Sequence, residues 1–209
     1  MEVRILDNPG QLESAPPFRI THLLWGTQSI PETYGYIGLI PGDGFYLKMV
    51  CMESDPLRTY TEDQSPVCMD STVEAFFNFT PENGGEPDSP APVYVNFEIN
   101  SNGALLAESG TGRRRRTPLP ENEMKKIRRR AQIEEDRWSI SLYIPLTVLK
   151  SIYGPLSLGK GSRFTCNFYK ICETAGKEHY ASWSPVLTEE PDFHRPEYFG
   201  TAKLISLQS

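Results

Sequence analysis

Three segments of this sequence alternate between apolar and polar side chains, and this two-residue period constrains the fold more than any other feature. The segments are STVEAFFNF (residues 71–79), PVYVNFEIN (92–100) and SRFTCNFYK (162–170). Successive side chains of a β-strand point to opposite faces of its sheet. Each segment therefore predicts a strand with one apolar face for a core and a second face of amides, carboxylates and aromatic rings.

If these three strands are neighbours, their second faces form one polar surface with aromatic edges. Its members would be Thr72, Glu74, Phe76, Asn78, Tyr94, Asn96, Glu98, Asn100, Arg163, Thr165, Asn167 and Tyr169. Solvation alone explains the polar face of many antiparallel sheets. Asn, Glu, Thr and Tyr are, however, short or stiff groups that donate or accept hydrogen bonds, which suits a ligand made of hydroxyls.

Further segments of the chain also favour strands over helices. PFRITHLLW (17–25), GFYLKMVCME (44–53) and RWSISLYIP (137–145) are rich in β-branched and aromatic residues and are bounded by turn formers. PLTVLKSIYG (145–154) predicts one short helix that begins at Pro145 and ends at Gly154. ENEMKKIRRRAQIEED (121–136) fits either a helical turn or a strand.

We therefore predict an all-β fold: a two-sheet antiparallel β-sandwich, immunoglobulin-like or jelly-roll-like, with one or two short helices. The chain has 209 residues, which is at the upper end for one all-β domain. A single domain is expected, with a core from about residue 18 to residue 206.

Composition and charge argue against several classes of protein. The formal net charge is -6, whereas nucleic-acid-binding domains are usually basic on at least one face. No segment approaches the roughly 20 apolar residues that span a bilayer. The N-terminal MEVRILDNPGQLESAPPF lacks the basic start and apolar run of a secretory signal. We expect a soluble, cytoplasmic protein without nucleic-acid or membrane partners, or a secreted one if a signal was removed.

The cysteines, histidines and carboxylates of the sequence show no spacing that is typical of a metal-binding site. The cysteines Cys51, Cys68, Cys166 and Cys172 form no CxxC pattern and are expected to be reduced thiols. His179 and His194 are too isolated for a zinc-like spacing. Glu53, Asp55, Asp63 and Asp70 offer oxygen ligands for a hard cation, although their spacing matches no compact calcium loop.

Two loops interrupt the strand pattern. The segment from Pro81 to Asp88 is rich in proline, glycine and acids and predicts a loop without chemistry of its own. Arg113 to Arg116 form a dense basic cluster, which is typical of a solvated loop whose arginines pair with nearby acids. The functional alternative is that one of them, with Arg115 as the candidate, reaches a ligand.

Several motifs together resemble the family 9 carbohydrate-binding modules and their stand-alone bacterial relatives, within the DOMON-like β-sandwiches. The most specific are DSTVE (70–74), WSP (183–185) and FHRPEYFG (193–200), and IPL (144–146) adds support. The resemblance runs from about Phe18 to Ile205. It implies a sandwich of two antiparallel sheets that binds carbohydrate without catalysis and can carry structural calcium, for which Asp55, Asp63 and Asp70 are the candidates.

In this family two tryptophans clamp a terminal sugar, and the resemblance places Trp183 where one of them is expected. The segment RTYTEDQSPVCMD (58–70), where the second would lie, contains Tyr60 as its only aromatic residue. A pyranose packs its C–H face on a flat ring, while its hydroxyls need hydrogen-bond partners at the rim. Trp25 fits burial at a strand end better than ligand contact, and Trp138 fits the core.

The predicted carbohydrate-binding residues are Trp183, Tyr60, Asn96, Glu98, Asn167, Arg115 and His194. A core position beside the last strand remains an equal reading for Trp183. His194, in a loop stiffened by Pro191 and Pro196, either donates to a ligand or holds that loop to a backbone carbonyl.

Three alternatives stay open beside non-catalytic sugar binding. Glu74 and Glu98, close together on adjacent strands, invite a glycoside hydrolase with one acid and one nucleophile. Met52 or Met69 with His179 would be the only candidate axial ligands of a haem-binding DOMON-type domain. The polar face would otherwise meet a protein partner or serve a structural role.

Overall fold

The computed structural model describes residues 1–80 and 92–206, and in these ranges the fold is all-β, as predicted. The loop expected from Pro81 to Asp88 lies outside the described residues. The strands are β1 (Glu2–Ile5), β2 (Phe18–Ile20), β3 (His22–Leu23), β4 (Thr33–Ile40), β5 (Gly44–Cys51), β6 (Thr72–Asn78), β7 (Tyr94–Asn100), β8 (Leu105–Gly110), β9 (Arg116–Pro118), β10 (Arg128–Ile133), β11 (Trp138–Pro145), β12 (Arg163–Cys172), β13 (His179–Ser182) and β14 (Gly200–Ser206). The helices are α1 (Glu121–Met124), α2 (Leu146–Tyr153) and the 3-10 turns η1 (Pro9–Ser14), η2 (Val67–Met69) and η3 (Pro196–Tyr198).

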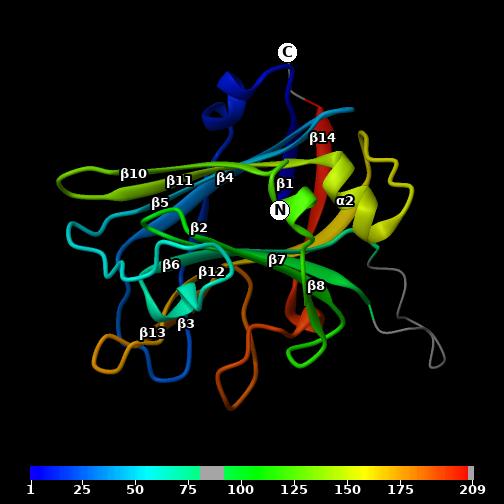
Figure 1. Ribbon diagram of the computed structural model, residues 1–209. Coiled ribbons are helices and arrows are strands. Elements are labelled where there is room, and N and C mark those ends of the chain that lie inside the picture. Colours follow the sequence, from blue (N-terminus) through cyan, green and yellow to red (C-terminus); the bar gives the residue numbers. More distant parts are fainter. Residues whose placement is uncertain (81–91, 207–209) are drawn as a thin grey trace.

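The strands join into one continuous, curled sheet in the order β10-β11-β5-β4-β1-β14-β12-β6-β7-β8-β9. Strand β2 pairs with β4, β13 with β12, and β3 with β13. In Figure 1, β10, β11, β5 and β4 form the upper half and β12, β6 and β7 the lower half. The sheet is not purely antiparallel, because β1 pairs in parallel with both β14 and β4 where it links the two halves.

The predicted apolar faces of β6, β7 and β12 lie in the main core. Phe77 of β6 and Phe164 of β12 meet Phe45 of β5, with ring centroids 6.4 Å and 5.5 Å away. All three rings are almost fully buried. Since Phe45 comes from the upper half and the other two from the lower half, the core fills the space between the two halves of the curled sheet.

Strand β4 was not predicted, because its glycines look like turn signals in the sequence YGYIGLI. Packing explains Gly38: a Cβ atom there would overlap the side chain of Leu6. The glycine therefore allows the chain after β1 to lie directly against β4, and Leu6 is buried.

Both helix expectations are confirmed. Helix α2 follows Pro145 and ends at Gly154, whose φ of 76° is in the left-handed region that favours glycine. The ambiguous segment 121–136 contains both alternatives in succession, since helix α1 ends at Met124 and strand β10 begins at Arg128. In the described ranges, no helix has the length and apolar character needed to cross a membrane.

Candidate functional site

The polar second faces of β12, β6 and β7 form one surface, because these strands are neighbours, as the alternation required. Glu74 of β6 lies opposite Glu98 of β7 on one side and Tyr169 of β12 on the other. This surface is not simply solvated. The chain from Val186 to Phe199 crosses it and buries most of its side chains.

A second apolar cluster holds this covering segment in place. Its buried members are Phe76, Tyr94, Tyr169, Ile171, Val186, Phe193 and Phe199. Phe193 stacks on Tyr169 with ring centroids 4.0 Å apart, and the Tyr169 hydroxyl donates to the Phe193 carbonyl at 3.2 Å. The crowd of aromatic residues near the C-terminus thus packs over the outer face of the sheet.

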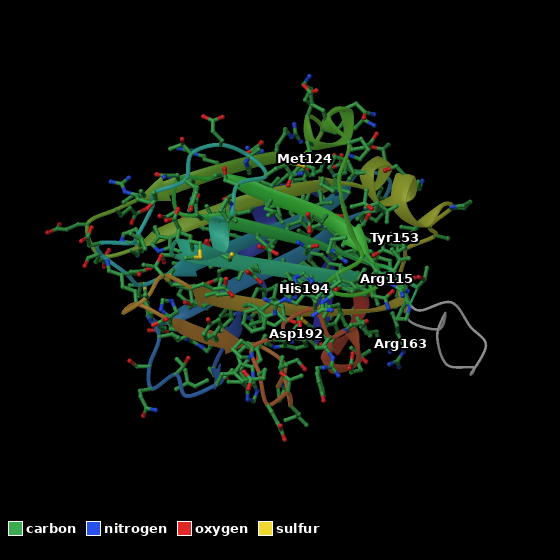
Figure 2. The ribbon with its side chains drawn as sticks, turned by 60° about the horizontal axis from the view of Figure 1, so that its bottom comes forward. Arg115, Met124, Tyr153, Arg163, Asp192 and His194 are labelled. Carbon is green, nitrogen blue, oxygen red and sulfur yellow. The ribbon has the colours of Figure 1, made fainter. Side chains whose placement is uncertain are left out.

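Beside this cluster the same face contains a cavity of about 90 Å³, which we name the acid pocket. Its lining residues are Trp25, Cys68, Glu74, Glu98, Arg113, Ile171, Glu173, Tyr180, Pro191, Asp192, Phe193 and His194. Figure 2 shows His194 and Asp192 near the middle of this face, with Arg115 displaced toward one side. Of the predicted site residues, Glu98 and His194 line the acid pocket.

Glu74 and Glu98 are the most unusual groups of the acid pocket, with exposed fractions of only 2% and 6%. Glu98 accepts a hydrogen bond from Asn96 Nδ2 at 2.9 Å. Glu74 Oε2 is buried without a hydrogen-bond partner among the described residues. Burial raises the pKa of Glu98 to about 7, and burial together with the charges of Glu98 and Glu173 raises the pKa of Glu74 well above its ordinary value.

Trp25 forms the aromatic wall of the acid pocket, although the sequence favoured simple burial for it. Its φ is 48°, a strained value for a bulky side chain, and its Nε1 donates to the Thr188 carbonyl at 2.9 Å. The ring centroid lies 5.4 Å from that of Tyr180 and 5.2 Å from that of Phe193. Trp25 and Tyr180 also line a second hollow of about 420 Å³, so the two spaces share these two residues.

The arginine cluster contributes to the acid pocket through Arg113 and not through Arg115. Arg113 lines it, donates to the Pro191 carbonyl at 2.7 Å and lies 3.7 Å from Asp192. Arg115, the predicted member of the cluster, is exposed and is not among the lining residues of the acid pocket. Arg116 is nearly buried and stacks 4.1 Å above the ring of Tyr94, which makes it a structural residue.

His194 faces the acid pocket but is held by a neighbour. The Tyr94 hydroxyl lies 3.0 Å from His194 Nδ1, and the His194 ring lies 5.1 Å from that of Phe76. Burial and the charges of Arg116 and Arg113 lower the pKa of His194 to about 3. The imidazole is therefore neutral near pH 7, and its Nδ1 shares a hydrogen bond with the Tyr94 hydroxyl.

Trp183 and Tyr60 lie apart from the acid pocket. Trp183 packs edge to face on Phe168 of the main core, with centroids 6.0 Å apart, and lines a separate hollow of about 560 Å³ with Phe18 and Arg19. We name this space the Trp183 hollow. Tyr60 donates its backbone N–H to Asp70 at 2.9 Å and is absent from the lining of the acid pocket. The structure does not bring these two aromatic residues together with Glu98.

Asn96 and Asn167 lie on the predicted face, but both are fully buried and used internally. Asn96 bonds to Glu98 and accepts a short hydrogen bond from Arg116. Asn167 donates to the Ser184 carbonyl at 3.0 Å and accepts from the Ser184 N–H at 2.8 Å. The two amides therefore fix the orientation of Glu98 and the start of the covering segment, and neither lines the acid pocket.

The acids proposed for calcium do not form a metal site. Asp70 accepts from the N–H groups of Thr59 and Tyr60 and from Asn100 Nδ2. Asp63 is paired with Arg129, and Asp55 is exposed. Among the described residues, no group of three metal-binding side chains is assembled. These carboxylates already have hydrogen-bond or ionic partners or point to solvent, so they do not fit a structural calcium ion.

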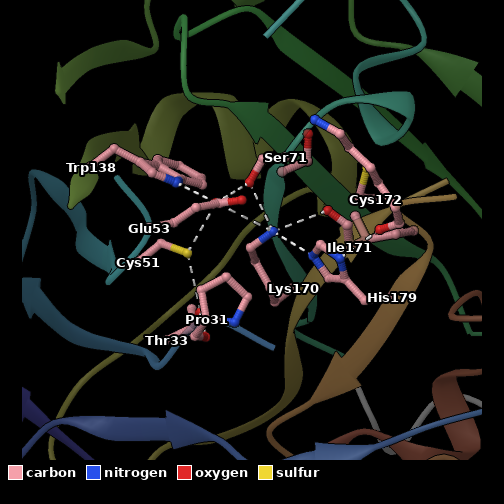
Figure 3. A network of polar contacts seen from close by, with 12 residues as sticks. Pro31, Thr33, Cys51, Glu53, Ser71, Trp138, Lys170, Ile171, Cys172 and His179 are labelled. Atoms are coloured by element: carbon pink, nitrogen blue, oxygen red, sulfur yellow. Dashed lines mark hydrogen bonds and ion pairs between the residues drawn. The ribbon is translucent and has the colours of Figure 1, made fainter. Parts of the chain in front are cut away.

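A second buried polar network surrounds Lys170 on the inner side of β12 (Figure 3). The Lys170 ammonium lies 3.9 Å from Glu53, 2.9 Å from Ser71 Oγ and 2.7 Å from His179 Nε2. Glu53 also accepts from Trp138 Nε1 at 2.8 Å. The polar groups of this network thus serve as hydrogen-bond and ionic partners for one another, as in a structural buried ion pair.

The same network removes His179 as a haem ligand. Burial and the charge of Lys170 lower the pKa of His179 to about 4. Its Nε2 is occupied by the Lys170 ammonium, and Nδ1 lies 2.9 Å from the Lys177 carbonyl. Neither ring nitrogen is available to iron, so the pairing of His179 with Met52 or Met69 has no structural support.

Comparison with known protein families gives one match. The sequence model described as carbohydrate-binding family 9 matches residues 15–204. A Bacteroides uniformis protein of known structure, provisionally described as carbohydrate-binding, superposes with a TM-score of 0.81 at 23% identity and 98% coverage of both chains. No curated protein matches the sequence.

A family 9 module from Caldicellulosiruptor kristjanssonii is also similar in structure. Its complex with cellotriose superposes with a TM-score of 0.67 at 10% identity, covering 100% of this chain and 95% of that chain. Its complex with glucose gives a TM-score of 0.63 at 10% identity, with 100% and 98% coverage. At these identities the likeness establishes a common fold.

Proposed function

The chain belongs to carbohydrate-binding family 9, and on this premise we propose that it binds a carbohydrate non-covalently in the acid pocket. One observation supports this position: the acid pocket combines aromatic rings with buried carboxyl groups on one sheet face. Trp25 and Tyr180 offer flat surfaces for the C–H face of a pyranose. Glu74 and Glu98 offer partners for its polar substituents.

The size of the acid pocket favours recognition of a small part of a saccharide. Its volume is about 90 Å³, whereas ligand pockets typically measure roughly 300–1,000 Å³. One edge of a single sugar residue would enter, and the remainder would lie against Trp25 and the second hollow of about 420 Å³. A site of this kind gives modest affinity, on the order of micromolar to millimolar Kd.

The arrangement of the acids favours binding over hydrolysis. Glycoside hydrolases place two carboxyl groups on either side of the bond that breaks. Glu74 and Glu98 are opposite residues of neighbouring strands, so both approach a ligand from the sheet. We therefore propose that the protein is not an enzyme. The test compares glycan turnover by the wild type with that of Glu74→Gln and Glu98→Gln, and we expect no turnover by any of the three proteins.

The family also suggests a finer description of the architecture. We propose that the curled sheet corresponds to a two-sheet β-sandwich and that the chain of residues 1–209 forms a single domain, with its core from about residue 18 to residue 206. The phenylalanine core between the two halves supports this description. The parallel strand β1 would then be the connection between the two sheets.

The decisive experiment is a pair of tryptophan variants. Glucose and cellotriose are the first ligands to titrate, by calorimetry and tryptophan fluorescence, because the C. kristjanssonii module was solved with both. We expect Trp25→Ala to weaken binding by at least about tenfold, because a stacking ring is lost. Trp183→Ala is the matched control and should retain wild-type affinity.

The opposite pattern would place the ligand elsewhere. If Trp183→Ala abolishes binding and Trp25→Ala does not, the Trp183 hollow is the site and the assignment to the acid pocket is wrong. If folded wild-type protein binds no mono- or oligosaccharide in a broad panel, carbohydrate binding itself is refuted in favour of a structural or protein-binding role.

A further inference from the structure

The charges that line the acid pocket are strongly unbalanced. Four carboxyl groups line it, belonging to Glu74, Glu98, Glu173 and Asp192, against the single guanidinium of Arg113. Arg113 is already engaged with Asp192 and with a backbone carbonyl. In the described ranges, no lysine or arginine forms an ion pair with any of the other three acids.

One of these acids also has an unused hydrogen-bonding atom. Glu74 is 2% exposed, lines the acid pocket, and its Oε2 has no partner in the described part of the chain. Leaving a buried polar atom unpaired is unfavourable, because the atom has lost its hydrogen bonds to water. The acid pocket therefore favours a ligand that carries a hydrogen-bond donor to this oxygen.

A hydroxyl and an ammonium both donate, but they differ in what else they require. A hydroxyl brings one donor and also needs donors of its own, whereas an ammonium brings three donors, no acceptor and a positive charge. An ionised carboxylate is an acceptor only. Two facing carboxylates with a third nearby thus match an ammonium better, and the faces of Trp25 and Tyr180 add cation–π attraction.

We propose, building on the proposed function, that the preferred ligand is an amino sugar with a free ammonium group, which binds between the carboxylates of Glu74 and Glu98. The sugar ring would lie against Trp25 and Tyr180, and the ammonium would occupy the acid end of the pocket. Acetylation of the amine would remove the charge and two of its donors, so N-acetylated sugars should bind less well.

The pH dependence of ligand affinity distinguishes binding of an ammonium group from binding of a neutral sugar. The charged and titratable groups around the two acids are Cys68, Glu108, Arg113, Arg116, Tyr169, Glu173, Asp192 and His194. The raised pKa values of Glu74 and Glu98 leave the pair partly protonated near neutral pH before a ligand binds. An ammonium ligand must displace that proton, so its affinity should rise with pH while the amine stays charged.

A neutral sugar predicts the opposite trend. It would use the protonated carboxyl as a donor, so its affinity should fall as pH rises through the same range. The sign of the pH dependence therefore reports which chemistry occupies the pocket.

The test is calorimetric titration with glucosamine, glucose and N-acetylglucosamine in amine-free buffers. We expect glucosamine to bind about tenfold or more tightly than the other two, because a charge-assisted hydrogen bond is worth about 1.5–3 kcal/mol. Its affinity should increase between about pH 6 and pH 7. Glu74→Gln should remove most of this preference, whereas the exposed control Glu135→Gln should keep it.

The outcomes distinguish this inference from the function on which it rests. If glucose binds as tightly as glucosamine and Trp25→Ala weakens both, carbohydrate binding holds and the amino-sugar preference is overturned. If glucosamine binds but ethanolamine, an amine without a sugar ring, binds equally well, the site recognises amines and sugar binding in the acid pocket fails. If none of these compounds binds while cellotriose or another saccharide of the panel does, the amino-sugar preference is overturned and carbohydrate binding holds.

Discussion

Glu74 and Glu98 face each other on neighbouring antiparallel strands, and both carboxyl groups line one small cavity. Opposite residues of such strands have Cβ atoms about 4.5–5.5 Å apart, a distance at which like charges destabilise the sheet. Burial is the main cause of the raised pKa values of both acids, and the charge of Glu98 adds to the rise at Glu74. The unfavourable acid pair thus lies at the proposed ligand site, where a bound ligand could form hydrogen bonds with both carboxyl groups.

The acid pair should make stability depend on pH in a defined direction. Its folded-state pKa values lie above the ordinary 4.5, so the folded protein binds more protons than the unfolded chain, and stability is lost as pH rises from about 4.5 toward 7 and beyond. Glu74→Gln removes this penalty. We expect its melting temperature to match the wild type near pH 4.5 and to exceed it by several degrees near pH 8.

The control for this prediction is Glu135→Gln, which changes the net charge equally at an exposed position. Its melting temperature should follow the wild type at every pH. A constant offset between Glu74→Gln and the wild type would mean that the acid pair is not the origin of the pH dependence.

His194 should contribute a dependence of the opposite sign. Its pKa is lowered from 6.5 to about 3 in the folded state, so the unfolded chain binds more protons, and stability falls as pH drops below about 6.5. The loss approaches about 1.4 kcal/mol per pH unit. In urea unfolding, His194→Gln should therefore lose less stability than the wild type between about pH 6.5 and pH 4.5. Equal slopes would contradict a buried, neutral imidazole.

Lys170 should be essential for stability, because its ammonium is fully buried beside Glu53. Lys170→Met leaves the Glu53 carboxylate without its cation, which costs about 3–5 kcal/mol for a buried pair. Lys48→Met breaks the more exposed pair with Glu13 and should cost less than about 1 kcal/mol. Urea denaturation compares the two, and similar losses would show that the Lys170 network is not an effective ion pair.

Gly200 should tolerate no larger residue. A Cβ atom at this position would overlap the Trp183 ring, so Gly200→Ala should destabilise the fold by about 1–3 kcal/mol through overpacking. Gly112→Ala is the control, because no atom lies within 4 Å of its Cβ position. Sugar affinity should be unchanged in both folded variants. A loss of affinity in Gly200→Ala alone would connect Trp183 to the ligand.

Much of the sheet follows from the sequence, because alternation is a local property of a strand. The inner faces of β6, β7 and β12 lie in the core as expected, and their outer faces share one surface. Strand β4 could not be predicted because its glycines resemble turn signals. The need for glycine at position 38 becomes clear only from the packing of Leu6 against it. The parallel pairing of β1 likewise joins segments that no local pattern connects.

The candidate site residues also divide into those that the sequence could and could not predict. Glu98 and His194 could be selected from the sequence because they lie on a polar strand face and in a proline-stiffened loop. The sequence favoured burial for Trp25 and gave Trp183 as the candidate stacking ring, whereas in the structure Trp25 lines the acid pocket and Trp183 does not. Their difference comes from the segment that crosses the sheet, whose Phe193 packs beside Trp25.

The sequence by itself determined which side chains share a strand face, because the two-residue period depends only on backbone geometry. The tertiary structure decided which of those side chains remain available. Asn96 and Asn167 form hydrogen bonds with Arg116 and Ser184, while Glu74 Oε2 has no hydrogen-bond partner within residues 1–80 and 92–206. Hydrogen-bond partners that come from distant parts of the chain are set by packing, and no local pattern encodes them.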